Sequence, residues 1–315
     1  MTKPEQIAVI GAGLMGHGIA QVFAVKGHPV RIVDSNKNSL NSVKDRVRGN
    51  LNSMIDQGLD FDLTIEDILD CITLSDDLIS ACKDSDFVIE AVFENLKLKQ
   101  EIFKKLDDLC SKNTILCTNT SVISITDIAR NIKHRERILG THFWNPPYLI
   151  PLVEVVRGEM TADWCASVTY ELLKRVGKYP VYVLKDVPGF IGNRMQHALW
   201  REAFAIIDEG ICSPEAIDDV IRNGFGLRLP ILGPIENADM VGLDLTLNIH
   251  DYILKYLNAD PTPSTTLQTK VTEGNLGFKS GIGFLEWSES SIVESRERLM
   301  KYLINVLIEQ QKQLK

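Results

Sequence analysis

A glycine-rich turn near the N-terminus constrains the fold more than any other feature of the sequence. It reads G-A-G-L-M-G at residues 11–16 and directly follows an apolar run at residues 6–10. Residues 14–26 then carry apolar side chains at helical spacing, and residues 30–34 form a second short apolar run. This order predicts a strand, a tight turn, a helix and a second strand, which together form a βαβ unit.

The turn matches the pattern G-x-G-x-x-G, which between a strand and a helix is typical of a dinucleotide-binding site. Gly11 permits the tight turn, Gly13 lets the backbone approach the pyrophosphate, and Gly16 allows the helix to pack closely on the strand. Leu14 and Met15 complete the predicted cofactor-binding turn, where the start of the helix offers free N–H groups to phosphates. A plain tight turn is the alternative for these glycines.

An acid ends the second strand: Asp34 follows Gly16 by 18 residues. A carboxylate at this position is expected to accept hydrogen bonds from the ribose hydroxyls and to repel a 2′-phosphate. The sequence therefore favours NAD over NADP as the cofactor and predicts an oxidoreductase. The alternative for Asp34 is a solvated carboxylate at the end of a strand.

Apolar runs alternate with helical segments as far as residue 184. Strands are expected at residues 87–92, 115–118, 138–143, 152–156 and 181–184, and helices at residues 38–70, 96–110 and 161–176. Strands that alternate with helices predict an α/β fold, here of the Rossmann type with a doubly wound parallel sheet.

The pattern changes at Asp186-Val-Pro-Gly, after which helical segments and glycine-proline loops follow with few strand signals. We therefore expect an NAD-binding domain at residues 1–186 and an all-α C-terminal domain at residues 187–315. The segment 292–315 reads as a polar helix that could pack on its own domain or on a partner chain. Its apolar positions are Leu299, Leu303, Val306 and Leu307.

Charge and composition narrow the function classes. A formal net charge of -8 argues against a nucleic-acid or anionic-membrane partner. The start of the chain lacks a signal-peptide pattern and no apolar run reaches about 18 residues, so a cytoplasmic protein without a membrane span is expected. The six cysteines show neither a C-x-x-C pair nor a metal-ligand spacing. Buried free thiols in a reducing cytosol, and no metal site, are therefore expected.

A histidine and an acid on neighbouring predicted strands are the candidate catalytic pair. Alcohol oxidation by hydride transfer needs a base for the hydroxyl proton, and histidine suits that role. His142 ends a strand of the predicted sheet, and Glu154 lies inside the apolar run Leu-Val-Glu-Val-Val. A buried carboxylate needs a partner, which an imidazole would provide. A satisfied core histidine and an unrelated strand acid are the alternative.

The segment around this pair, residues 141–156, resembles the signature of the L-3-hydroxyacyl-CoA dehydrogenase family. The resemblance covers nearly the whole chain in order. Besides the glycine turn, it includes Val88-Ile-Glu-Ala-Val-Phe-Glu-Asn-Leu-Lys-Leu-Lys, Thr118-Asn-Thr-Ser, Pro188-Gly-Phe-Ile-Gly-Asn-Arg, Gly233-Pro, Val241-Gly-Leu-Asp and Gly277-Phe-Lys-Ser-Gly-Ile-Gly-Phe. It implies that His142 and Glu154 form a catalytic dyad and that the helical domain pairs in a homodimer.

The resemblance also implies roles for single residues. Ser121 matches a serine that hydrogen-bonds the substrate oxygen and the histidine, and Asn193 matches an asparagine near the reacting carbon. Glu94 and Lys99 match positions in the nicotinamide-side NAD pocket, and Asn119 matches a contact to the nicotinamide ribose. The alternatives are a helix N-cap for Ser121, a solvent-facing side chain for Asn193, and an exposed helical pair for Glu94 and Lys99.

The predicted helical hairpin after the second strand departs from the family. The acyl-CoA enzymes carry basic residues there, whereas this chain has no Lys or Arg from Gly49 to Cys82. The acids of this stretch are Asp56, Asp60, Asp62, Glu66, Asp67, Asp70, Asp76 and Asp77, with Arg46, Arg48 and Lys83 at its margins. An acidic hairpin should repel a polyanion such as CoA.

Other segments are closer to relatives that act on free small substrates. These are L-gulonate 3-dehydrogenase with λ-crystallin, carnitine dehydrogenase, and a dehydrogenase of vitamin B6 catabolism. Asn145-Pro-Pro-Tyr and Glu209-Gly-Ile-Cys-Ser-Pro point this way, and Arg228 is a candidate for binding a free carboxylate or a plain surface charge. We expect a small 3-hydroxy acid or related alcohol as the substrate. A true L-3-hydroxyacyl-CoA dehydrogenase, acting on 3-hydroxybutyryl-CoA, is the alternative.

Two other classes of protein are alternatives to a dehydrogenase of this family. A crystallin-like structural protein would not need the dyad, Ser121 and Asn193, which are all present. The β-hydroxyacid dehydrogenases share the glycine turn but use a catalytic lysine, and the His–Glu pair argues against them.

Overall fold

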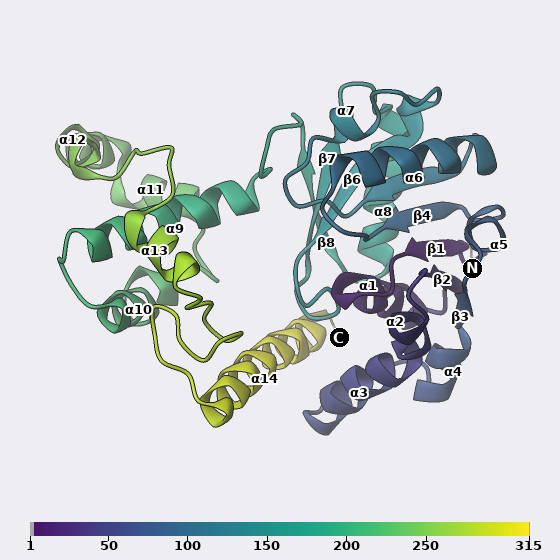
Figure 1. Cartoon of the computed structure of the whole chain (residues 1–315), viewed down its shortest axis with the longest axis horizontal. Coiled ribbons are helices and arrows are strands. Elements are labelled where there is room, and N and C mark those ends of the chain that lie inside the picture. The colour runs from purple at the N-terminus through teal and green to yellow at the C-terminus, as the bar shows by residue number, and fades with distance from the viewer. Residues whose placement is uncertain (1–2, 315) are drawn as a thin grey trace. The chain divides into compact units, whose positions relative to one another are not determined.

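The computed structural model describes residues 3–314. The chain forms two compact units (Figure 1). The first runs to Arg194 and takes up the chain again from Leu299, and the second is Met195–Arg298.

An eight-stranded sheet forms the centre of the first unit, in the order β3-β2-β1-β4-β5-β6-β7-β8. All neighbouring pairs are parallel except β6 and β7. The predicted Rossmann-type α/β fold is confirmed. The strands are β1 (Ile7–Ile10), β2 (Val30–Val33), β3 (Ile72–Ser75), β4 (Phe87–Glu90), β5 (Ile115–Thr118), β6 (Ile138–Phe143), β7 (Leu152–Arg157) and β8 (Tyr179–Val183).

The antiparallel pair corrects the expectation of a fully parallel sheet. A parallel connection needs a crossover of about a dozen residues or more, and only residues 144–151 join β6 to β7. The register of this pair sets His142 directly opposite Glu154. The short connection therefore brings the two candidate catalytic residues side by side.

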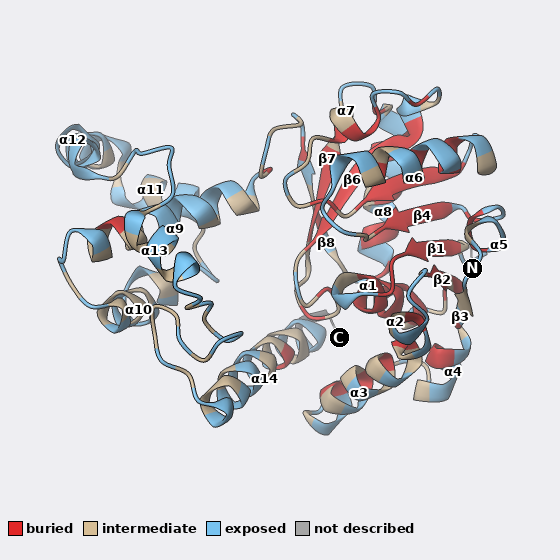
Figure 2. Cartoon of the chain, in the orientation of Figure 1, coloured by how far each residue is buried: buried red, intermediate tan, exposed pale blue. Residues whose placement is uncertain are grey.

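Helices cover both faces of the sheet, and the core lies between these layers (Figure 2). Alternate residues of β1 enter different apolar clusters: Ile7 and Val9 pack with α1, α3 and α8, while Ala8 and Ile10 pack with α5, α6 and α7. The helices are α1 (Leu14–Ala24), α2 (Lys37–Asn41), α3 (Val43–Asp56), α4 (Ile65–Asp70), α5 (Leu78–Cys82), α6 (Leu96–Leu109), α7 (Ile125–Ile128) and α8 (Asp163–Arg175), with a 3-10 turn at Arg135–Arg137.

The cysteines are all free, as expected, but they are not all buried. Cys82, Cys110, Cys117 and Cys165 are buried, whereas Cys71 and Cys212 are partly exposed. Cys71 directly precedes β3, which is an edge strand and has a neighbouring strand on one side only. No group of three or more metal-ligating side chains was found among the described residues.

The second unit is helical, as predicted. Its helices are α9 (Gly192–Asp208, which begins in the first unit), α10 (Pro214–Asn223), α11 (Pro234–Val241), α12 (Leu243–Ile253) and α13 (Thr265–Thr272), with 3-10 turns at Phe225–Leu227 and Leu254–Tyr256. Extended structure in this unit is limited to isolated bridges that join Ile282 to Gly277 and to Glu286.

The C-terminal helix α14 (Glu289–Leu314) returns to the first unit from Leu299 on. Ile304 is fully buried there with Met54, Leu59 and Leu149, and Leu303 and Leu307 pack against the same cluster. The apolar stripe thus packs within the chain, although Leu299 itself is 53% exposed. Lys315, the last residue of the expected helix, lies outside the described residues. None of the described helices is both long and apolar enough to cross a membrane.

Candidate active site

The glycine turn between β1 and α1 has the shape that its sequence predicts. Gly11 has φ +102°, and a Cβ there would lie 2.6 Å from the Ala91 carbonyl oxygen. A Cβ on Gly16 would lie 1.8 Å from the Gly11 carbonyl oxygen, so both positions require glycine. A Cβ on Gly13 would meet no atom within 4 Å, and the next residue, Leu14, is 66% exposed.

The N-terminus of α1 at this turn lacks a side-chain cap. Gly13 is the N-cap residue and contributes no side-chain hydrogen bond, and Met15 is only partly buried in the first turn. Uncapped N–H groups at an open helix N-terminus are donors suited to phosphate oxygens. The residues present therefore fit the pyrophosphate of NAD.

Asp34 lies beside the turn and is tied to it. One carboxylate oxygen accepts the N–H of Ala12 at 2.7 Å, and the other accepts the N–H of Asn36 at 2.7 Å. The side chain is held by the backbone rather than extending freely into solvent, and it is partly buried. This placement fits the predicted acceptor for the ribose hydroxyls.

His142 and Glu154 form a buried hydrogen-bonded pair. Nδ1 of His142 lies 2.7 Å from Oε2 of Glu154, and its Nε2 lies 3.2 Å from Oγ of Ser121. An ionised carboxylate can only accept, so Nδ1 carries the proton and Nε2 presents its lone pair in the neutral imidazole. The structure thus brings together three residues that the sequence placed on separate segments.

The second oxygen of Glu154 is also engaged. Oε1 accepts the N–H groups of Ile191 at 2.9 Å and Gly192 at 3.0 Å, and the Trp144 indole N–H lies 3.4 Å from Oε2. Burial alone would raise the pKa of Glu154, but the hydrogen bonds with His142, Gly192 and Ile191 outweigh it and hold the pKa below its ordinary value. Glu154 is therefore ionised beside the imidazole at neutral pH.

Two aromatic rings flank His142, and the sequence did not predict either of them as part of the site. The ring centroids of Trp144 and Phe190 lie 5.5 and 5.6 Å from that of His142. Phe190 is buried and has φ +49°, and a Cβ on Gly192 would lie 2.4 Å from the Trp144 ring. The motif Pro188-Gly-Phe-Ile-Gly could have indicated this part of the site, because two glycines within four residues indicate an unusual backbone conformation.

Asn193 and Asn119 both bind the backbone next to the dyad. Nδ2 of Asn193 donates to the Ser121 carbonyl at 3.0 Å, and Oδ1 of Asn119 accepts the Phe143 N–H at 2.8 Å. Asn193 is partly buried, so it does not simply face solvent. Helix α7 is capped by the hydroxyl of Ser124, which leaves Ser121 in contact with His142 instead of acting as that cap.

Glu94 joins this cluster through Ser121. Its Oε1 accepts the N–H of Ser121 at 2.9 Å, the N–H of Val122 at 3.1 Å and the hydroxyl of Thr120 at 2.6 Å. Burial would raise the pKa of Glu94, but the bond from Thr120 and the charge of Lys99 lower it overall.

Lys99 is buried in α6, which corrects the alternative of an exposed helical pair. It is 1% exposed, and its Nζ lies 2.7 Å from Oε1 of Glu90 and 3.4 Å from Oε2 of Glu94. Glu90 is fully buried and also accepts the hydroxyl of Thr118 at 2.7 Å. The sequence did not predict Glu90 as a partner of Lys99.

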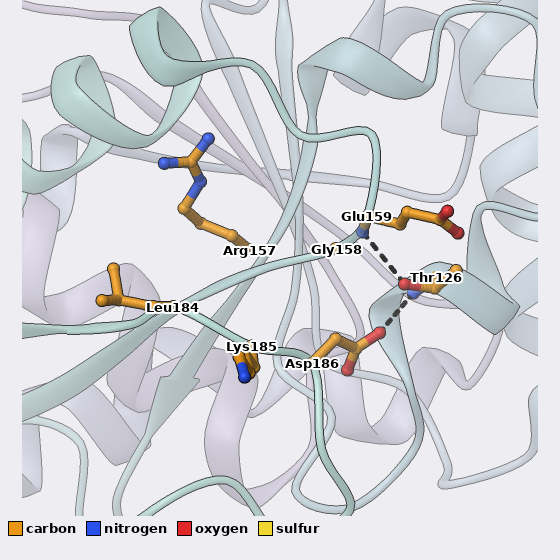
Figure 3. Close-up of a pocket in the computed structure, with 7 residues that line it drawn as sticks. All are labelled: Thr126, Arg157, Gly158, Glu159, Leu184, Lys185 and Asp186. Carbon is orange, nitrogen blue, oxygen red and sulfur yellow. Dashed lines mark hydrogen bonds between the residues drawn. The ribbon is translucent and has the colours of Figure 1, made fainter.

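A separate pocket of about 490 Å³ lies where the chain leaves β8, and it includes no predicted site residue (Figure 3). Oδ2 of Asp186 accepts the Ser124 hydroxyl and the Thr126 N–H, both at 2.7 Å. The Glu159 N–H donates to the Thr126 hydroxyl at 3.0 Å. Asp186 thus holds the end of the sheet to the start of α7.

Comparison with known proteins agrees with these observations. The NAD binding domain of 3-hydroxyacyl-CoA dehydrogenase matches residues 6–187, and the C-terminal domain of the same family matches residues 189–287. The fold and the cofactor turn define an NAD-dependent oxidoreductase that acts on CH–OH groups. The chain belongs to the 3-hydroxyacyl-CoA dehydrogenase family.

The relatives include enzymes with and without a CoA-linked substrate in their names. The chain is 38% identical over 288 residues to a probable 3-hydroxybutyryl-CoA dehydrogenase of Bacillus subtilis (strain 168), covering 91% of this chain and 99% of the relative. It is similar to the structure of 5-formyl-3-hydroxy-2-methylpyridine 4-carboxylic acid 5-dehydrogenase, with TM-score 0.88, 30% identity and coverage of 96% and 97%. The (S)-3-hydroxybutyryl-CoA dehydrogenase of Ralstonia eutropha gives TM-score 0.75, 37% identity and coverage of 91% and 100%.

Proposed function

We propose that His142 and Glu154 are the catalytic dyad of this dehydrogenase. The observation that carries the proposal is the buried 2.7 Å contact between Nδ1 and Oε2, which leaves Nε2 of His142 without a proton, facing the Ser121 hydroxyl. NAD, when bound, supplies the hydride acceptor. His142 takes the proton from the substrate hydroxyl, and Glu154 stabilises the imidazolium that forms. In the reverse direction the imidazolium returns the proton to the ketone oxygen.

Ser121 and Asn193 are proposed to position the substrate oxygen. The Ser121 hydroxyl lies 3.2 Å from Nε2 of His142, so an oxygen bound near that nitrogen would also be within reach of the serine. Asn193 holds the backbone of Ser121. Its amide therefore fixes the serine that faces the dyad.

We assign the cofactor to the glycine turn and to the carboxyl ends of the neighbouring strands. Gly13, Leu14 and Met15 would face the pyrophosphate, Gly11 and Gly16 would permit the backbone path of the turn, and Asp34 would face the ribose. Glu94, Lys99 and Asn119 are proposed for the nicotinamide side. Because Lys99 is buried against Glu90 and Glu94, we expect it to act through Glu94.

The proposed substrate is a small 3-hydroxy acid or related alcohol, and the acidic hairpin of α3 and α4 favours it. Two of the cations at the margin of this hairpin are engaged: Arg48 forms an ion pair with Glu66, and Arg46 binds backbone carbonyls. Among the described residues, Asp62 and Glu66 are the only acids of the hairpin in ion pairs, so a polyanionic substrate group would meet the other carboxylates. An acyl-CoA substrate remains the second candidate, because the relatives include 3-hydroxybutyryl-CoA dehydrogenases.

An NAD-coupled screen separates these substrates. We would compare 3-hydroxybutyryl-CoA, free 3-hydroxybutyrate, L-gulonate and L-carnitine by the rate of NADH formation. A kcat/KM for a free acid at least tenfold above that for the thioester would support the proposal. Efficient turnover of acetoacetyl-CoA with a low-micromolar KM would contradict it and favour the CoA-linked alternative.

We also propose that the protein is a homodimer through its helical domain. In α12, Leu243 and Leu247 lie one turn apart on the same side of the helix and are each more than 60% exposed, and the helix contains no buried residue. Contiguous exposed apolar side chains are typical of an interface. Light scattering on the purified protein should give twice the mass of one chain. A monomer at micromolar concentration would contradict the proposal.

A non-catalytic, crystallin-like role is disfavoured by the intact hydrogen-bonded set around His142. A structural protein has no need to keep an ionised, buried carboxylate next to an imidazole, since buried charges are costly. Detectable turnover in the substrate screen would exclude this role.

A further inference from the structure

Arg46 lies in the first turn of α3, and its guanidinium reaches the glycine turn. Nη2 donates to the Ala12 carbonyl at 2.6 Å, and Nη1 donates to the Gly13 carbonyl at 3.2 Å. Two carbonyls of the α2 region also accept from it, Ser39 from Nη2 at 2.9 Å and Ser42 from Nε at 3.4 Å. One side chain therefore joins the turn to the helices that follow β2.

His17 is the fifth partner of Arg46. Its Nδ1 lies 3.0 Å from Nη1 of Arg46 and 2.9 Å from the Gly13 carbonyl oxygen, so one tautomer accepts from Arg46 and the other donates to the carbonyl. Burial lowers the pKa of His17, the Gly13 carbonyl raises it, and the charge of Arg46 lowers it, with a net lowering. A neutral ring at this position is consistent with that direction.

These contacts use four of the five donors of Arg46 on backbone carbonyls. An arginine carries five N–H groups, and the fifth is on Nη1, which lies 3.0 Å from Nδ1 of His17. Every nitrogen of the guanidinium therefore already donates to a backbone carbonyl. Arg46 can influence a dinucleotide through the backbone that it holds.

The carbonyls held by Arg46 determine where the N–H groups of the turn point. In a planar trans peptide the C=O of one residue and the N–H of the next point in opposite directions. By drawing in the carbonyls of Ala12 and Gly13, Arg46 directs the N–H groups of Gly13 and Leu14 away from α3. These groups lie at the open helix N-terminus, where phosphate oxygens are bound.

Asp34 holds the other side of the same segment. Its Oδ2 accepts the Ala12 N–H at 2.7 Å, so Asp34 fixes the N–H of Ala12 and Arg46 fixes its carbonyl. A turn held at both ends loses little further conformational freedom when a ligand binds, and such preorganisation increases affinity.

We propose that Arg46 is a positioning residue for NAD, which orients the N–H groups of the glycine turn toward the pyrophosphate without touching the cofactor. The inference rests on the proposed cofactor role of the turn. It concerns binding of the dinucleotide and not proton transfer, so it does not depend on which hydroxy acid is the substrate.

The test compares Arg46→Met and Arg46→Lys with the control Arg48→Met. Arg48 lies two residues further along α3 and pairs only with the exposed Glu66 among the described residues. The ligands are NADH and ADP-ribose, which share the pyrophosphate, and binding is measured by titration calorimetry. Hydrogen bonds from charged groups contribute roughly 1.5–3 kcal/mol, which corresponds to about 10- to 100-fold in affinity.

Arg46→Met should weaken both ligands by the same factor, about 10- to 100-fold, while kcat at saturating NAD changes less than about threefold. Arg48→Met should bind like the wild type. An Arg46→Met protein that folds and binds ADP-ribose normally would overturn the inference. If that variant does not fold, Arg46→Lys decides, because it keeps the charge but not the planar fork: unchanged ADP-ribose affinity overturns the inference, and a severalfold loss at unchanged kcat supports it.

The same experiment separates the proposed role of the glycine turn from the proposed role of Arg46. A wild-type protein that binds neither NADH nor ADP-ribose would contradict the proposed role of the whole turn. A wild-type protein that binds both, with an Arg46→Met variant that binds them equally well, would contradict the role of Arg46 alone. A loss confined to NADH would also contradict it, since the nicotinamide half lies away from the pyrophosphate.

Discussion

At the scale of single residues, Glu154 connects the most parts of the site. One oxygen binds His142, and the other binds the N–H groups of Ile191 and Gly192. The carboxylate thus fixes the imidazole and the start of the segment that leads into α9. Its ionisation and its burial are compatible because every contact to it comes from a donor.

The contacts of Asp34 and Arg46 with the glycine turn lead to a prediction about the choice between NAD and NADP. Asp34→Ser should weaken NAD without producing useful activity with NADP, because each nitrogen of the Arg46 guanidinium already donates to a backbone carbonyl. Steady-state kinetics with both cofactors measure this. A rise of more than tenfold in kcat/KM for NADP would show that Arg46 can be redirected to a 2′-phosphate.

The sequence was sufficient to predict His142 and Glu154, since a carboxylate in an apolar strand needs a partner and the surrounding segment resembles a known family. It was not sufficient for Phe190 and Trp144. Their place beside the imidazole depends on the backbone path through Gly192, and sequence spacing does not encode how two distant segments meet.

At the scale of elements, the buried Lys99 shows that the pattern of apolar and charged residues in a helix does not always predict which charged side chains face solvent. Helix α6 alternates apolar and charged residues, and a lysine in such a pattern is expected to face solvent. Lys99 instead lies beneath the loop that joins β4 to α6, where Glu90 and Glu94 compensate its charge. Nothing local in the sequence distinguishes it from the other lysines of the helix.

Lys99→Met should destabilise the protein strongly, because it leaves Glu90 buried without its counter-charge. Breaking a buried ion pair on one side costs about 3–5 kcal/mol. Urea unfolding measures the change, and Arg48→Met, which breaks an exposed pair, should have no measurable effect. A Lys99→Met protein within about 1 kcal/mol of the wild type would contradict this account of the network.

The sheet shows a similar division between what the sequence predicts and what it does not. Seven strands follow from apolar runs, but β3 was not predicted. Only Ile72 of its four residues is buried, because β3 is an edge strand and presents a weak apolar signal. The direction of β7 follows from the connection between β6 and β7, which is too short for a parallel crossover.

At the scale of the whole molecule, α14 lies beyond the segment that the family models match, which ends at residue 287. Its last turns nevertheless pack on the first unit through Ile304, next to Leu149. Leu149 lies in the connection between β6 and β7, seven residues after His142. The C-terminal helix therefore supports the loop that follows β6.

Ile304→Ala should destabilise the first unit by about 2–5 kcal/mol, as expected for a fully buried isoleucine. Leu299→Ala, on the same helix but 53% exposed, is the matched control and should have a much smaller effect. Urea unfolding of both variants measures the difference. Equal effects would mean that the contact with Leu149 does not stabilise the protein.

The central claim is that Glu154 enables His142 to accept the substrate proton, and turnover of Glu154→Gln tests it most directly. In a comparable histidine-orienting position, an amide in place of the acid lowers kcat by about 10⁴-fold with intact geometry. With any substrate found in the screen, we predict a loss of about 10³- to 10⁴-fold in kcat, with the fold and NADH affinity retained. A folded variant that keeps most of its turnover would contradict the claim.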